Sequence, residues 1–96
     1  MSINVTPANN IVGEGGMARF IATAGGINMN NFLYQWKKRG NDNLPNKVSG
    51  ADGTVLTIPH VVESDEGQYY CIVTNEWGRS VESDNVSLTV KGTYIL

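Results

Sequence analysis

Apolar and polar residues alternate along much of the chain, so that every second side chain is hydrophobic. A period of two is typical of β-strands that bury one face, whereas an amphipathic helix repeats its apolar residues every three to four positions. No segment shows the helical pattern. The alternation predicts strands at about residues 3–5, 18–24, 33–38, 55–58, 69–73 and 86–90.

Clusters of turn-forming residues separate these predicted strands. The chain contains 11 Gly and 11 Asn but only 3 Pro, and Gly and Asn favour the backbone conformations that tight turns require. Many short strands joined by short turns indicate an antiparallel sandwich or barrel. We therefore predict an all-β protein.

The length and charge of the chain narrow the classes of function. A chain of 96 residues is enough for one domain. Its formal net charge of −2 does not attract phosphate backbones, so nucleic acid is not an expected partner. No apolar stretch approaches the ~20 residues of a membrane-spanning helix, so membrane insertion is not expected. Cys71 is the only cysteine, which excludes a disulfide within the chain.

A run of spaced residues in the second half of the chain carries the strongest signal for the fold. Residues 65–78 read DEGQYYCIVTNEWG, which resembles the F strand of immunoglobulin domains, D-x-G-x-Y-x-C-x-A-x-N-x-x-G, with Val73 in place of Ala. Trp36 lies 35 residues before Cys71 and resembles the core Trp of strand C. The resemblance implies one immunoglobulin-like two-sheet sandwich over residues 1–91, with residues 92–96 as a linker or tail.

The resemblance also implies a set of core residues. Trp36 would fill the space between the sheets, and the hydroxyl of Tyr69 would bond to backbone just before strand F, an arrangement called the tyrosine corner. The residues expected in the core are Phe20, Ala22, Trp36, Leu56, Ile58, Tyr69, Cys71 and Leu88.

Position 22 departs from the family pattern. Ala22 lies 49 residues before Cys71, where the strand B cysteine belongs. A bridge closing such a loop would stabilise the fold by about 4 kcal/mol on the chain-entropy model, and this domain does without it. The short spacing resembles that of the intermediate set (I-set) or the similar C2 type. Pro7 would divide the first strand into the A and A′ strands of the I-set.

The sequence lacks the residue groups that catalysis or metal binding requires. His60 is the only histidine, and Cys71 points into the expected core, so a nucleophile–base pair is not expected. A zinc site needs three or four ligands, and the acidic residues do not have the spacing of a calcium loop. We expect no enzymatic activity, no cofactor and no metal.

A binding surface for protein partners is expected at one end of the sandwich. The resemblance places the B–C and F–G loops together, so that Ile27, Met29, Phe32 and Trp77 would form an apolar patch. Alternatively, this patch packs against a neighbouring domain, or Phe32 and Trp77 pack within their own domain. Unpaired strand edges, or the apolar residues 93–96, would also allow pairing with a second molecule, including an edge-strand homodimer.

Two functions remain open at this point. The domain is either a recognition module of an adhesion or receptor protein, or a structural spacer in an intracellular array such as those of muscle and cytoskeletal proteins. The missing bridge favours the intracellular compartment, whereas the larger number of extracellular family members favours the cell surface. The triplets Asn4–Thr6 and Asn85–Ser87 are N-glycosylation sequons, although about one or two are expected by chance. Both asparagines would be acceptors in a secreted domain.

Overall fold

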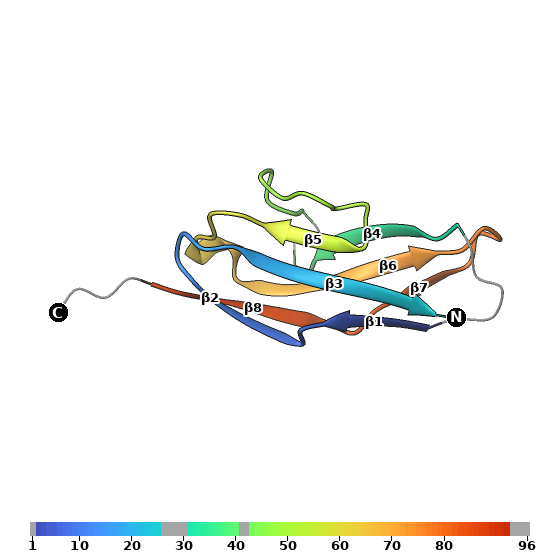
Figure 1. Ribbon diagram of the computed structural model, residues 1–96, viewed down its shortest axis with the longest axis horizontal. Coiled ribbons are helices and arrows are strands. Elements are labelled where there is room, and N and C mark those ends of the chain that lie inside the picture. Colours follow the sequence, from blue (N-terminus) through green and yellow to red (C-terminus); the bar gives the residue numbers. More distant parts are fainter. Residues whose placement is uncertain (1, 26–30, 41–42, 93–96) are drawn as a thin grey trace.

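The computed structural model describes residues 2–25, 31–40 and 43–92. Within these ranges the chain forms short β-strands and one 3-10 helix, η1, arranged as two packed sheets (Figure 1). The elements are β1 (Ser2–Thr6), β2 (Asn9–Gly13), β3 (Ala18–Gly25), β4 (Leu33–Lys38), β5 (Val55–Ile58), η1 (Glu63–Asp65), β6 (Gly67–Thr74), β7 (Ser80–Glu82) and β8 (Val86–Lys91). The prediction of an all-β, two-sheet fold is confirmed.

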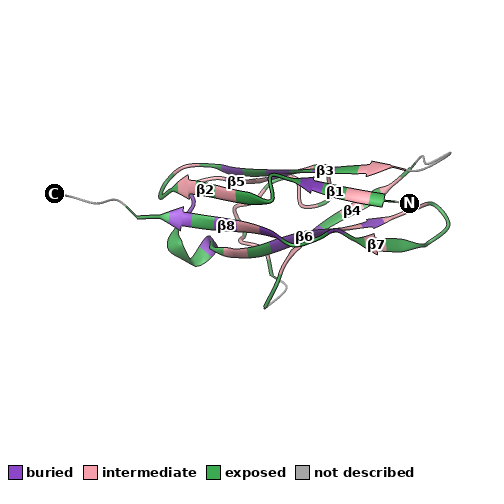
Figure 2. Cartoon of the chain, turned by 90° about the horizontal axis from the view of Figure 1, so that it is seen from below, coloured by how far each residue is buried: buried purple, intermediate pink, exposed green. Residues whose placement is uncertain are grey.

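The strands divide between a smaller and a larger sheet. The smaller sheet has the order β1-β3-β5, and the larger has the order β2-β8-β6-β4, with β7 also pairing with β6. Along the strands, buried positions alternate with more exposed ones, as Figure 2 shows. Each sheet therefore turns one face toward the core and the other toward solvent.

The first strand of the sequence is divided between the two sheets at Pro7. β1 pairs antiparallel with β3, whereas β2 runs parallel to β8, so one pair departs from the antiparallel arrangement. Pro7 has no backbone N–H and cannot continue the ladder with β3. After it, the carbonyl of Ala8 accepts a hydrogen bond from the N–H of Ser87, and the chain joins the larger sheet. Assignment to the I-set subtype stays a prediction.

An aromatic cluster fills the centre of the core. The ring of Phe20 lies 6.5 Å from that of Trp36 and 5.8 Å from that of Tyr69, measured between centroids. These distances suit tilted aromatic contacts. The side chains assigned to the core from the sequence are no more than 4% exposed: Phe20, Ala22, Trp36, Leu56, Ile58, Tyr69, Cys71 and Leu88.

A short segment between the sheets replaces part of the connection that the missing disulfide would make. In residues 50–54, the Ala51 carbonyl accepts from the backbone N–H of Trp36 at 2.9 Å, and the Gly53 carbonyl accepts from the Trp36 indole at 2.8 Å. The Thr54 carbonyl accepts from the N–H of Ala22 at 2.8 Å. Since Trp36 and Ala22 lie in different sheets, these bonds join the two layers.

The segment can follow this path only because it begins with glycine. Gly50 has a φ of +77°, which is unfavourable for other residues. A Cβ at this position would lie 1.8 Å from the carbonyl oxygen of Val55, which is a severe clash. Gly50 therefore allows the loop to approach β5 closely enough to bond both sheets.

A second set of polar contacts fixes the turn that leads into β6. The hydroxyl of Tyr69 donates to the carbonyl oxygen of Asp65 at 2.5 Å, which is the tyrosine corner expected from the sequence. The buried carboxylate of Asp65 accepts from the N–H of Val62 at 2.9 Å and forms an ion pair with Lys47 at 2.7 Å. Each buried polar group at this turn therefore has a partner.

We expect Tyr69→Phe to reduce the free energy of unfolding by about 1–3 kcal/mol, because the buried Asp65 carbonyl would lose its donor. Urea unfolding measures this change. Tyr34→Phe is the matched control, since the Tyr34 hydroxyl has no hydrogen bond within the described residues, and it should change stability little. Equal losses in the two variants would contradict a structural role for the Tyr69 hydroxyl.

We expect Ala22→Cys to form a disulfide with Cys71 under oxidising conditions, because both positions are buried between facing sheets. The bridge should raise the free energy of unfolding by about 4 kcal/mol relative to the reduced variant. Thiol titration and urea unfolding, with and without reductant, measure bridge formation and stability. The double variant Ala22→Cys, Cys71→Ala is the control. Two titratable thiols after oxidation would show that the residues lie too far apart.

Candidate functional site

The turn between β6 and β7 presents an exposed tryptophan on a backbone that hydrogen bonds hold in place. The Asn75 side-chain oxygen accepts from the N–H groups of Trp77 and Arg79, both at 2.9 Å. The Asn75 N–H donates to the Arg79 carbonyl at 2.9 Å, and the Gly78 N–H donates to the Asn75 carbonyl at 3.0 Å. Trp77 is 82% exposed. It therefore does not pack against its own sheet, which was one alternative for this residue.

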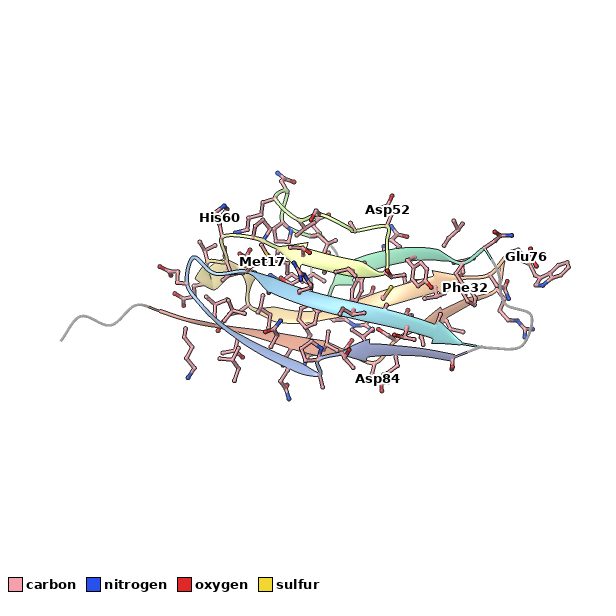
Figure 3. All side chains as sticks on the ribbon, viewed as in Figure 1. Met17, Phe32, Asp52, His60, Glu76 and Asp84 are labelled. Carbon is pink, nitrogen blue, oxygen red and sulfur yellow. The ribbon has the colours of Figure 1, made fainter. Side chains whose placement is uncertain are left out.

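The loop that precedes β4 meets this turn. The side-chain amide of Asn31 donates to a carboxylate oxygen of Glu76 at 3.5 Å, and Figure 3 places Phe32 and Glu76 at the same end of the sandwich. Ile27 and Met29, which the sequence also assigned to the patch, lie outside the described residues. The structure thus brings the two loops together and leaves the contribution of these two side chains as a prediction.

Phe32 and the next residue differ in their exposure. Phe32 is half-buried and packs against the core, with its ring 6.2 Å from that of Tyr34 in an edge-on arrangement. Leu33 is 70% exposed and was not among the predicted site residues. Because Trp36 faces inward, alternation along the strand places Leu33 outward, so the sequence did contain the signal. We call this area the loop-end surface. It consists of Phe32, Leu33 and Trp77, with Asn31 and Glu76 beside them.

A shallow groove continues from the loop-end surface along the outer side of β4. Its volume is about 650 Å³, and its lining includes Leu33, Gln35, Lys37, Leu44 and Ile72. This lining mixes apolar side chains with few charges, so it offers contact area rather than a reactive centre. The groove extends the area available to a partner at this end of the molecule.

The basic residues at the end of β4 are largely occupied by contacts within the domain. Lys38 donates to the Ser64 carbonyl at 2.9 Å. The guanidinium of Arg39 lies 3.7 Å from the centroid of the Tyr70 ring and forms a 3.0 Å ion pair with Glu82. Such exposed contacts add modest stability. The charges of Lys38 and Arg39 are therefore engaged by groups of the domain itself.

The described residues contain no group of three or more potential metal ligands. A nucleophilic mechanism would need Cys71 as the nucleophile and His60 as its base. Cys71 is buried in the core, whereas His60 is exposed at the surface. Burial raises the pKa of the Cys71 thiol from 9.0 to about 11, against a weaker lowering by the Gln35 backbone. Burial, with a smaller effect from Asp65, also raises the pKa of Tyr69 well above its ordinary value. These groups remain protonated at neutral pH.

Comparison with known proteins assigns the family. Residues 2–75 match the family model described as "Immunoglobulin domain". The chain is also 35% identical over 99 residues to Protein sax-3 of Caenorhabditis elegans, covering 94% of this chain and 8% of that protein. It is 32% identical over 56 residues to Tyrosine-protein kinase receptor ver-3 of the same organism, covering 58% of this chain and 4% of that protein.

The chain belongs to the immunoglobulin domain family, as the resemblance in its sequence predicted. This family is non-catalytic, so the domain itself is not an enzyme. The chain spans less than a tenth of each of the two relatives. Among the described residues, no helix has the length and apolar character needed to cross a membrane.

We expect the unfolding free energy to fall as the pH rises from 9 toward 11, partly because of Cys71. The folded state holds the thiol proton more tightly, since burial raises its pKa from 9.0 to about 11. The resulting stabilisation is fully present below pH 9 and is lost as pH rises through the folded pKa. Urea unfolding across this range should show a smaller fall for Cys71→Ala. Identical pH dependence in both proteins would contradict the contribution of the thiol.

Proposed function

We propose that this immunoglobulin domain is a protein-recognition module of a larger adhesion or receptor protein, and that it binds its partner through the loop-end surface. The observation that carries the proposal is Trp77, which is 82% exposed on a turn that several hydrogen bonds hold in place. An exposed tryptophan on an ordered backbone is a suitable interface anchor.

The surroundings of Trp77 support this proposal. Leu33 adds a second exposed apolar side chain, opposite Thr74 in the β4–β6 register. The hydrogen-bonded side chains of Asn31 and Glu76 supply polar groups at the same end. A protein interface commonly has an apolar centre and a polar rim. Because hydrogen bonds already hold the turn, binding would lose less conformational entropy than binding by a flexible loop.

The comparisons support a receptor context. One relative is named as a tyrosine-protein kinase receptor, and the immunoglobulin domain generally mediates protein–protein interaction. Since the match covers only 4% of that protein, it supports the presence of a similar module rather than the activity of the whole relative.

A structural spacer in an intracellular array is the second candidate function. It is favoured by Ala22 and the free, buried thiol of Cys71, because domains without the bridge suit a reducing compartment. In Figure 1, β1 begins at the loop end and β8 ends at the opposite end. A domain joined before Ser2 would therefore approach the loop-end surface, which would then form an interdomain contact.

Substitution of Trp77 tests the proposed surface. We expect Trp77→Ala to weaken partner binding by about 2 kcal/mol or more, roughly thirtyfold in Kd, while stability stays within about 0.5 kcal/mol of the wild type. Binding would be measured against purified receptor ectodomains and against recombinant neighbouring immunoglobulin domains. Ile11→Ala is the matched control, because Ile11 is 64% exposed on β2, and it should leave both quantities unchanged.

The outcomes separate the two functions. Trp77-dependent binding to a separate protein supports recognition. Trp77-dependent binding only to a neighbouring domain of the same parent protein supports the spacer. A loss of about 3 kcal/mol or more in stability would assign Trp77 to the core and overturn the proposed surface. Unchanged binding of Trp77→Ala to a confirmed partner would also overturn it.

A further inference from the structure

Two sequons in this chain have different local surroundings. The triplet Asn4–Thr6 lies in β1, and the triplet Asn85–Ser87 spans the start of β8. A domain of an exported receptor or adhesion protein, as proposed above, would meet the glycosylation machinery during export, and this inference rests on that proposed function. We propose that Asn85 is the N-glycan acceptor of the domain, in preference to Asn4.

Asn85 lies where the last strand of the larger sheet is interrupted. β7 ends at Glu82 and β8 begins at Val86, and the intervening residues include the exposed Asn85. The buried hydroxyl of Ser83 fixes this interruption, because it accepts from the Cys71 N–H and donates to the Asp84 carbonyl, both at 2.9 Å. The local backbone therefore does not depend on the side chain of Asn85.

The amide of Asn85 can carry a sugar without losing its contacts in the folded domain. Its oxygen accepts from the Arg39 side chain at 2.8 Å, and its nitrogen donates to the Gln68 side chain at 3.3 Å. Glycosylation replaces only one of the two hydrogens on Nδ2 and leaves Oδ1 unchanged. Both contacts are therefore retained when the sugar takes the second hydrogen position and extends into solvent.

The Asn4 triplet is a poorer acceptor because Pro7 follows it directly. Proline restricts the preceding residue, Thr6, to an extended conformation and supplies no N–H of its own. The transferase must bring the acceptor amide and the hydroxyl of the third residue to one centre, which requires the chain to bend. In the second triplet Leu88 follows Ser87, so the nascent chain keeps this freedom.

The proposed reaction is a transfer from a lipid-linked oligosaccharide diphosphate. The Nδ2 of Asn85 forms a bond to C1 of the reducing-end N-acetylglucosamine, and the bond from that C1 to the lipid diphosphate oxygen breaks. Nδ2 loses one proton, and the lipid diphosphate is the leaving group. No oxidant or reductant is required.

A glycan at Asn85 would leave the loop-end surface open. Figure 3 shows Asp84, the neighbour of Asn85, at the lower edge of the sandwich, whereas Glu76 lies at the loop end. The sugar would instead cover the area around Arg39 and Gln68, to which Asn85 bonds. A bulky hydrated glycan excludes partners from the surface that it covers, so binding would be directed to the loop end.

The test is site occupancy in the full chain, exported from eukaryotic cells behind a cleavable signal peptide. Peptide mapping before and after peptide N-glycosidase should find the sugar at Asn85 and little at Asn4. Asn85→Gln and Ser87→Ala should each lose the glycosidase-sensitive mass shift, whereas Asn4→Gln and Ser87→Thr should keep it. Ser87→Thr is the matched control, because it retains the hydroxyl that the sequon needs.

Analysis of both the medium and the cell membranes keeps the result independent of secretion efficiency. Absence of sugar at Asn85 in the exported chain, or a sugar mainly at Asn4, overturns the proposal. Partner binding measured with unglycosylated protein keeps the two proposals apart. If binding depends on Trp77 but Asn85 carries no glycan, the recognition function is supported and the glycan site is overturned. If Asn85 carries a glycan but binding does not depend on Trp77, the glycan site is supported and the recognition surface is overturned.

Discussion

The placement of Trp36 between the two sheets is the constraint on which the rest of the fold depends. Its ring packs near Phe20, and its indole and backbone N–H groups donate to Gly53 and Ala51. The same loop bonds Ala22 through Thr54. Because Ala22 stands where the strand B cysteine of the family belongs and Cys71 is free, hydrophobic burial and this hydrogen-bonded segment hold the sheets together without a covalent link.

The core also determines how the loop-end surface is presented. Trp36 and Cys71 lie opposite each other in the register of β4 with β6, and the same register brings Leu33 opposite Thr74. The two strands therefore reach the loop end together, one after Phe32 and the other just before the Trp77 turn. A rigid strand pair thus supports a surface formed by two loops, which limits the positional freedom of its apolar side chains.

The sequence predicted the fold well because the alternation and the spacing of Trp36, Tyr69 and Cys71 report on a core with one buried face per strand. It did not predict the parallel pairing of β2 or the bonds of residues 50–54, because these depend on contacts between distant segments. The exposure of Trp77 was also undecided, since a tryptophan in a turn can pack inward or face solvent with the same sequence pattern. Leu33 was missed although alternation marked it as outward-facing.

The recognition and spacer functions make different demands on the same surface. β1 begins at the end where Trp77 is exposed, so a preceding domain and a separate partner would compete for one area. An exposed apolar patch that polar residues surround is typical of an interaction site, and Trp77 and Leu33 are both largely exposed. Under either proposed function, the loop end would therefore be covered by another domain or protein. The two functions differ in whether the covering domain belongs to the same parent protein. A domain joined to this one would be present at a high effective concentration, so it would leave no free surface for a separate partner.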